Sequence, residues 1–298
     1  MNYIIGMCKK HKDWITVLAD LGYSPELVEQ KIRTSSEDIV KPDIIVTSTK
    51  LVHSLVFECK GGITIDQNQI KRYSALEKTN LLRWVGHASP MFTPDNFRFD
   101  VGISDLEENH PFVVAEVRDL PIITFGASKV VKSGEFRSSE LNAAFKNPIS
   151  LSGKVPPLSY YPFCEEDKDP YIATFVIRGL LAIAIKKAKG GPTAFDESLI
   201  TRDEILKSLF NPIIDALAKE HQGRLKERIK EIIRWVMAKE EMKEAFGTIE
   251  QQAGYKISRP LEKLANEASK FIENLETQQS LMPFFKPCAE GSACLRAR

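Results

Sequence analysis

The chain has 298 residues, of which 43% are hydrophobic and 27% are charged, and its formal net charge is +1. This length favours one large domain or two modest ones, and the composition allows an ordinary globular core. No repeat period or long low-complexity tract is visible, which excludes a repeat architecture. The near-zero net charge argues neither for nor against a polyanionic partner, because basic residues can still cluster locally.

Neither a secretory signal nor a membrane span is predicted. The first ten residues place a short apolar run before Lys9 and Lys10, which is the reverse of the order in a signal peptide. The longest apolar segment, residues 172–185, is interrupted by Arg178 and is too short to cross a bilayer. The five cysteines form no CxxC pair, which is typical of free thiols in a reducing compartment. We therefore expect a cytoplasmic protein with no membrane partner.

The first predicted element is a helix over residues 9–21, where apolar side chains recur at helical spacing. Gly22 is well placed to end this helix. Residues 27–33 predict a strand, and the polar residues 34–38 predict a turn.

Two apolar runs, residues 44–46 and 51–57, are joined by a short polar connection and predict an antiparallel hairpin. Asp66 is placed to cap a helix over about residues 67–78. Residues 81–85 predict a fourth strand. The expected order is therefore helix, three strands, helix, strand, which is an α/β arrangement.

The remainder of the chain changes character in its second half. Residues 91–162 are loop-rich, with short β-like runs at 112–117 and 121–125. Helical periodicity then dominates over residues 170–187, 203–218, 224–246 and 260–277. We expect residues 1–165 to form an α/β domain with a β- and loop-rich extension from about 91, residues 166–283 to form a mostly helical domain, and residues 284–298 to form a flexible tail.

A candidate catalytic patch lies on the predicted hairpin. Asp43 begins one strand and Glu58 ends its neighbour, so antiparallel pairing places them side by side. Lys60 lies two residues after Glu58 and shares its face of the sheet. The Cys59 side chain points the other way, but its backbone carbonyl could add a ligand oxygen. Hard carboxylate oxygens suit Mg²⁺, which commonly takes one or two protein carboxylates together with water and substrate phosphate.

This patch is typical of phosphodiester hydrolysis. A metal neutralises the phosphate and makes hydroxide available near neutral pH. Lys60 can stabilise charge on the phosphoryl oxygens or hold the attacking water. The alternative interpretation is a surface hairpin with Asp43 in a turn and a solvated pair of Glu58 and Lys60. Against it, no packing reason explains this pair at the end of a strongly apolar strand.

These motifs resemble those of a known superfamily. A proline followed by Asp43, a strand, and then Glu58 and Lys60 in an ExK motif resemble the PD-(D/E)XK nucleases. Gln69 and Tyr73, four residues apart on one face of the next helix, match the QxxxY motif of the RecB-like branch. The resemblance covers about residues 9–86, under a third of the chain.

The resemblance implies a restriction-endonuclease-like core with a central mixed sheet, a DNA substrate, and Mg²⁺ as cofactor, with Mn²⁺ as a substitute. It also implies that Gln69 and Tyr73 lie beside the metal and position the DNA strand or water. Family members often carry a further upstream acidic residue, for which Glu29 and Glu26 are the candidates. An exposed strand or turn carboxylate is an equally good interpretation of Glu29.

The helical half carries many basic residues, at positions 207, 219, 224, 226, 228, 230 and 234. They predict either a DNA- or partner-binding module or, because acidic residues interleave with them, a charge-balanced solvated face. The leading hypothesis is a metal-dependent deoxyribonuclease acting in restriction-like defence, recombination or repair. Two alternatives remain: a non-catalytic nucleic-acid-binding or assembly subunit, and a nuclease active only in a complex. A protein partner or a second copy would then bind through the helical domain.

Overall fold

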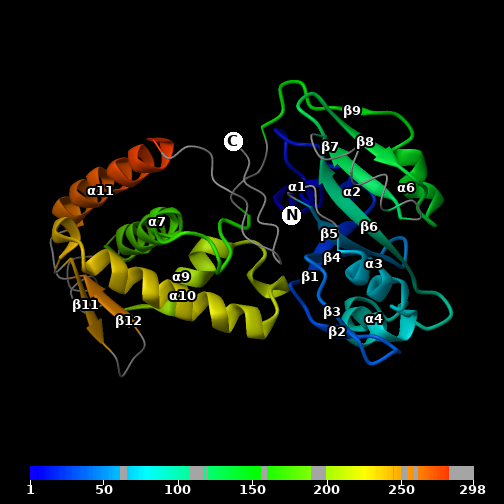
Figure 1. The fold of residues 1–298 in the computed structure, drawn as a ribbon, viewed down its shortest axis with the longest axis horizontal. Coiled ribbons are helices and arrows are strands. Elements are labelled where there is room, and N and C mark those ends of the chain that lie inside the picture. The colour runs from blue at the N-terminus through cyan, green and yellow to red at the C-terminus, as the bar shows by residue number, and fades with distance from the viewer. Residues whose placement is uncertain are drawn as a thin grey trace. The chain divides into compact units, whose positions relative to one another are not determined.

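A computed structural model describes residues 1–60, 66–107, 117, 120–155, 160–188, 199–243, 245–249, 254–257 and 261–281 (Figure 1). The chain divides into two compact units. The first comprises residues 1–160 together with the short segment 215–218, and the second begins at Tyr161. The division falls a few residues before the expected boundary, and the segment 215–218 packs with the first unit rather than with its chain neighbours.

The first unit is built on a seven-stranded sheet with the order β1-β4-β5-β6-β7-β8-β9. The strands are β1 (Tyr23–Val28), β4 (Ile44–Ser48), β5 (His53–Cys59), β6 (Arg98–Leu106), β7 (Ile122–Phe125), β8 (Lys129–Ser133) and β9 (Ile149–Ser150). Strands β5, β6 and β7 run parallel, whereas the other neighbours pair antiparallel. The α/β class, the central mixed sheet and the antiparallel hairpin β4–β5 are therefore confirmed.

The N-terminal segment differs from its prediction. Helices α1 (Asn2–Met7) and α2 (Val17–Asp20) replace the single helix expected over residues 9–21. Trp14 and Leu18 are buried all the same, because an irregular segment can also turn apolar side chains toward a core. Gly22 follows α2 with φ +81°, a left-handed conformation that glycine adopts without strain.

Strand β1 also has different ends, since it begins at Tyr23 and stops at Val28. Glu29, with φ +58°, interrupts the strand. A separate two-stranded ribbon follows, made of β2 (Ile32–Arg33) and β3 (Ile39–Val40), with the predicted polar turn between them. This β2–β3 ribbon leaves the sheet after Glu29 and returns to it at β4.

Two helices connect the hairpin to β6. Helix α3 (Gln67–Ser74) is capped by Asp66, whose side chain accepts the Asn68 backbone N–H at 2.8 Å, as predicted. Helix α4 (Lys78–Val85) occupies the residues predicted as the fourth strand, so that prediction is wrong. A capping box between Glu77 and Asn80 starts α4, and its buried residues Leu81 and Val85 lie four apart on one face. The fourth strand is β6 instead.

The loop-rich region contributes the far part of the sheet. The run at 121–125 is confirmed as β7. Helix α6 (Ser139–Ala144) precedes β9. Before this region, a short 3-10 turn, η1 (Gly86–Ala88), follows α4. The run predicted at 112–117 lies outside the described residues except for Val117, which is buried.

The second unit is mostly helical, as expected. Its main helices are α7 (Asp169–Ala188), α9 (Arg202–Phe210), α10 (Lys219–Met237) and α11 (Leu261–Leu281), with a 3-10 turn η4 (Glu240–Met242). Another 3-10 turn, η3 (Ile214–Ala216), lies between α9 and α10 in sequence and belongs largely to the first unit. The helix expected over 203–218 stops at Phe210, because Asn211 is extended and Pro212 cannot continue the backbone hydrogen bonding. A small sheet, β10 (Ile200–Thr201), β12 (Gly254–Ile257) and β11 (Phe246–Ile249), was not expected. Among the described residues, no helix is long and apolar enough to cross a membrane. The expected tail, residues 284–298, lies outside the described residues.

The two faces of the large sheet are covered differently. We call the face that carries Ile45 and Val56 the front face. Helices α3 and α4 pack on it through Tyr73, Leu81 and Val85. The back face carries Phe125, which contacts the Tyr3 ring of α1 at 4.9 Å and lies 6.5 Å from the Trp14 ring. Both faces are therefore buried, which explains the near-continuous apolar runs of β4 and β5.

Candidate metal and catalytic site

A row of three carboxylates crosses the front face at one edge of the sheet. Ile44 pairs with Phe57, so the antiparallel register places Asp43 opposite Glu58. Val28 pairs with Ile44, which places Glu29 opposite Asp43 in the same way. The Glu29 backbone N–H donates to the Asp43 carbonyl at 3.2 Å, which confirms that step of the register. Strands β1, β4 and β5 thus contribute one acidic residue each.

Glu58 is held by two donors from different elements. Lys60 Nζ lies 3.1 Å from Glu58 Oε1, and Tyr73 donates its hydroxyl to Glu58 Oε2 at 2.7 Å. Lys60 Nζ also approaches Gln69 Oε1 at 3.4 Å, a long and weak contact. The structure therefore brings Glu58, Lys60, Gln69 and Tyr73 together, with α3 lying over the hairpin because Asp66 starts it at the required point.

The buried environment of Asp43 perturbs its electrostatics strongly. Its Oδ2 accepts the Cys59 backbone N–H at 2.6 Å, and its side chain is buried. Burial raises the pKa of Asp43 well above its ordinary value, and the negative charges of Glu58 and Glu29 raise it further. Asp43 therefore favours a proton or a bound cation in its neighbourhood.

Cations accompany the carboxylates of the row. Lys60 pairs with Glu58, and Lys41 pairs with Glu29. The N-terminal ammonium of the buried Met1 is also close enough to lower the pKa of Asp43, so three ammonium groups accompany the three carboxylates. The carboxylates still repel one another, and a cation bound between Asp43 and Glu58 would reduce that repulsion.

The two upstream candidates are placed differently. Glu29 lies in the row beside Asp43, as just described, and is not the exposed carboxylate of the alternative interpretation: its side chain is only 9% exposed. Glu26 lies at an irregularity of β1 and forms an ion pair with His87 at 2.9 Å. The structure therefore assigns Glu29 and not Glu26 to the acidic row.

Cys59 contributes through its backbone. Its thiol is fully buried on the back face, as predicted from the strand period, and burial raises its pKa to about 12. The thiol thus stays protonated at neutral pH and is not a metal ligand. Its N–H fixes the Asp43 carboxylate, and its carbonyl lies in the chain between Glu58 and Lys60.

The donor set fits Mg²⁺ but does not form a closed cage. Within the part of the chain that the structure describes, no cluster of three or more His, Cys, Asp or Glu side chains is arranged to hold a metal ion. The available donors are the facing carboxylates of Asp43 and Glu58 together with the Cys59 carbonyl. Mg²⁺ suits such a site, because it keeps several waters and commonly takes only one or two protein carboxylates.

One acidic residue of this face escaped the sequence analysis. Cys59 pairs with Ser104, and the Lys60 N–H donates to the Ser104 carbonyl at 2.7 Å, so Asp105 is the neighbour of Lys60 across the parallel pair β5–β6. Asp105 is 1% exposed and shares the front face with Ile103. It was missed because the fourth strand was predicted at residues 81–85; the alternation of Ile103 and Asp105 was the available signal.

A second buried polar group lies on the back face and was also missed. The Tyr23 hydroxyl lies 2.8 Å from His53 Nδ1, and His53 Nε2 lies 3.2 Å from Asp100 Oδ2 without the alignment of a hydrogen bond. The Arg137 backbone N–H donates to both Asp100 oxygens at 3.0 and 3.2 Å. We call Tyr23, His53 and Asp100 the back-face triad. Here an acid and a base alternate, so no like charges face each other.

The fold and its site define an α/β protein with a mixed sheet and a buried acidic row at one edge of that sheet. Residues 1–161, which span the sheet, match the MJECL32 domain, and the chain belongs to that family. An uncharacterized protein, MJECL32 of Methanocaldococcus jannaschii, is 24% identical over 203 residues, which cover 62% of this chain. The match spans 45% of that relative, less than half of its length. No solved structure matches the chain.

Proposed function

We propose that the first unit is a magnesium-dependent deoxyribonuclease with a restriction-endonuclease-like core. The observation that supports it most is the row of Asp43 and Glu58 on adjacent strands, with Lys60 paired to Glu58 and with Tyr73 and Gln69 above it. The order of helix, antiparallel strands, helices and parallel strand β6 supports it as well.

The metal would be held by Asp43, Glu58 and the Cys59 carbonyl. When bound, Mg²⁺, or Mn²⁺ in its place, supplies charge neutralisation at the scissile phosphate and lowers the pKa of a water. Lys60 stabilises charge on the phosphoryl oxygens from the same face of the sheet. Tyr73 fixes the orientation of Glu58 through its 2.7 Å hydrogen bond. Gln69 orients Lys60 and the substrate strand.

The test is cleavage by the purified full chain. End-labelled single- and double-stranded DNA are incubated with Mg²⁺, with Mn²⁺ or with EDTA. We expect cleavage that requires the divalent metal and is lost in Asp43→Ala and Lys60→Ala. Glu26→Gln is the matched control, because Glu26 is a carboxylate of the neighbouring strand that lies outside the row, and it should cleave at the wild-type rate.

Four outcomes contradict the proposal or change it. Cleavage that survives both Asp43→Ala and Lys60→Ala removes the site assignment, and cleavage in EDTA removes the metal. DNA binding without cleavage under every metal condition favours a non-catalytic subunit, and cleavage gained only on adding a partner favours a nuclease active in a complex. Calorimetric titration of Mn²⁺ into wild type and Asp43→Asn tests metal binding separately from activity.

A further inference from the structure

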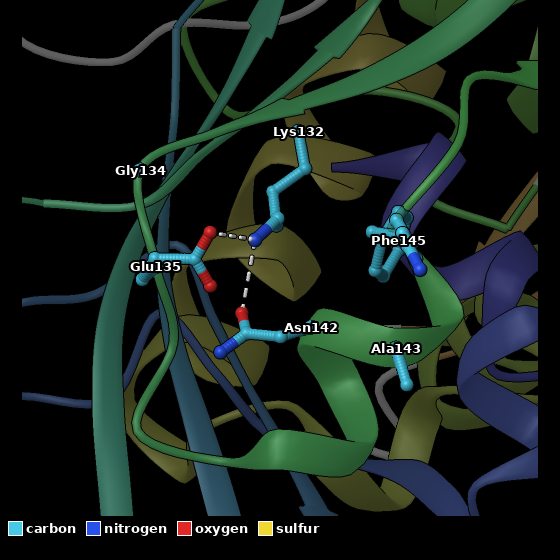
Figure 2. Close-up of a pocket in the computed structure, with 7 residues that line it drawn as sticks. Lys132, Gly134, Glu135, Asn142, Ala143 and Phe145 are labelled. Atoms are coloured by element: carbon cyan, nitrogen blue, oxygen red, sulfur yellow. Dashed lines mark hydrogen bonds and ion pairs between the residues drawn. The ribbon is translucent and has the colours of Figure 1, made fainter.

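Two pockets of the first unit lie away from the acidic row, and they differ in whether their cationic side chains are held by neighbouring residues. Figure 2 shows the first, a pocket of about 460 Å³ beside β8 and α6. Its Lys132 ammonium is held by Glu135 at 2.9 Å and by Asn142 at 3.0 Å, and Asn142 is itself fixed to the Phe136 backbone. The Lys132 ammonium already has two partners, so its charge gives no reason to expect a bound anion in this pocket.

The second pocket, of about 530 Å³, is cationic and partly aromatic. We call it the ribbon–α4 groove, and its lining comes from the β2–β3 ribbon and from α4: Lys31, Arg33, Ile39, Asn80, Arg83 and Trp84. Three of these six residues are cations and none is acidic. The volume falls within the roughly 300–1,000 Å³ range of ligand pockets, large enough for one or two nucleotides but not for a duplex.

The groove residues face outward because of the local secondary structure. Along the ribbon, Lys31 and Arg33 are exposed whereas Ile32 between them is buried, and Ile39 pairs with Arg33 and is 49% exposed. On α4, Arg83 and Trp84 are exposed while Leu81 and Val85 point into the core. Core packing therefore explains why Ile32, Leu81 and Val85 are apolar. It does not explain the cations of the groove or the exposed side chains of Ile39 and Trp84.

The ion pair of Arg33 in the groove contributes little energy. Arg33 pairs with Glu37 at 2.7 Å, with both side chains more than 60% exposed. Exposed pairs of this kind contribute about 0–1 kcal/mol, so a phosphate can displace Glu37 at little cost. By contrast, the basic residues of α10 are committed to carboxylates: Arg224 to Glu165, Arg228 to Asp169, and Lys226 to Asp203. Arg33 is therefore more available to a ligand than these residues of α10 are.

The groove is joined to the acidic row through the chain itself. The β2–β3 ribbon begins just after Glu29 and ends just before Asp43, and Lys31 lies two residues from Glu29, at most about 7 Å along the backbone. Lys41, which pairs with Glu29, lies opposite Lys31 on the ribbon by continuation of its register. The ribbon also packs on α3 and α4. Figure 1 shows the ribbon beside these two helices.

We propose that the ribbon–α4 groove binds a single-stranded segment of nucleic acid next to the acidic row. Lys31, Arg33 and Arg83 contact phosphates, and Trp84 stacks on an unpaired base with Ile39 beside it. An exposed tryptophan among cations suits a single strand, whose bases are free to stack, more than a duplex, whose bases are covered. This inference deepens the proposed function, since it names the form of substrate that reaches that site.

The test measures binding by the full chain in EDTA, so it does not depend on cleavage. The probe is a fluorescein-labelled 20-nucleotide oligo(dT), with oligo(U) and a 20-base-pair duplex in parallel. The variants are Trp84→Ala, Lys31→Glu and Arg83→Glu. The matched control is Lys129→Glu, which reverses an exposed lysine on β8 of the same unit. Melting curves verify that each variant is folded, as expected for exposed positions.

We expect Trp84→Ala to weaken oligo(dT) binding about 5- to 100-fold with little change in its salt dependence, because stacking is not ionic. Each charge reversal should weaken binding at least about tenfold and reduce the slope of log K against log salt by about 0.7–1. Lys129→Glu should stay within about twofold of wild type. A preference for oligo(dT) or for oligo(U) identifies the sugar, and either supports the inference.

The inference is overturned if the three groove variants bind oligo(dT) as tightly as wild type does. It is also overturned if the duplex binds as tightly as oligo(dT) and Trp84→Ala changes neither, or if polyglutamate displaces oligo(dT) at equal charge concentration. Failure of the proposed function is distinguishable: groove-dependent binding without metal-dependent cleavage contradicts the nuclease alone, and cleavage with unaffected groove variants contradicts the groove alone.

Discussion

The two faces of the large sheet both bury polar side chains, but they arrange charge in opposite ways. On the back face, the Tyr23 hydroxyl is hydrogen-bonded to His53, the other His53 nitrogen lies 3.2 Å from Asp100, and the Arg137 N–H donates to Asp100. On the front face, burial raises the pKa of Asp43, and the neighbouring carboxylates of Glu58 and Glu29 raise it further. Neighbouring groups of opposite polarity stabilise a fold, whereas closely spaced like charges destabilise it unless cations or a ligand neutralise them. Burial of polar groups alone therefore does not mark the site; the close approach of like charges does.

The largest expected effect separates two buried lysines of the same sheet. Lys60→Met removes the ammonium beside Glu58 and should lower the cleavage rate about 10²–10³-fold, the usual loss for one group that stabilises transition-state charge. Lys132→Met also removes a buried ammonium, yet Asn142 keeps its bond to the Phe136 N–H, so cleavage should stay within about twofold. Single-turnover rates for the two variants measure the contrast. Equal losses in both would mean that Lys60 acts through folding alone.

The next effect concerns stability and belongs to the back face. Asp100→Ala strands the Arg137 N–H and the buried His53, which should cost about 2–4 kcal/mol and lower Tm by about 5–15 °C. Cleavage assayed well below Tm should be unchanged within about twofold. A loss of cleavage larger than tenfold in the folded variant would bring the back-face triad into the catalytic machinery and would break the comparison.

A matched pair of tyrosines gives a smaller contrast. Tyr73→Phe frees one oxygen of Glu58 and should lower cleavage about 10- to 100-fold, as loss of a hydrogen bond to a metal ligand does. Tyr23→Phe removes the hydroxyl beside His53 and should lower stability by about 1 kcal/mol with no change in cleavage. Cleavage rates and urea melts of both variants measure the contrast. If Tyr23→Phe lost cleavage and Tyr73→Phe lost only stability, the catalytic role would belong to the back face.

The smallest effect is a pH dependence of stability without metal. The pKa of Asp43 is raised in the folded state, so the folded protein binds this proton more tightly than the unfolded chain does. Stability from this group is full below the ordinary carboxyl pKa of about 4 and is lost as the pH rises toward the raised folded value. Asp43→Asn removes this loss and retains an acceptor for the Cys59 N–H.

In EDTA at pH 8, Asp43→Asn should therefore melt about 2–4 °C above wild type for each 1 kcal/mol relieved, and the difference should vanish near pH 4. Added Mg²⁺ should raise the Tm of wild type and not that of the variant. Parallel pH profiles for the two proteins would show that Asp43 is not strained by its neighbours.

The sequence was sufficient where local patterns settle the geometry. The two apolar runs around a short polar turn defined the hairpin, and its antiparallel register placed Asp43 beside Glu58. The strand period placed Lys60 on the same face, and Asp66 determined where α3 begins, so that Tyr73 reaches Glu58. The sequence failed at α4, where Leu81 to Val85 is too short an apolar run to distinguish a strand from a buried helix face.

What the sequence by itself determined is the set of chemical groups on β4, β5 and α3, because each follows from neighbours within about thirty residues. Only the tertiary structure decided which other charges accompany them. Glu29 joins Asp43 through the pairing of β1 with β4, Asp105 joins Lys60 through the parallel pairing of β5 with β6, and the β2–β3 ribbon meets α4 to form the groove. These contacts depend on long-range strand pairing and helix packing, for which the local sequence carries no periodic signal.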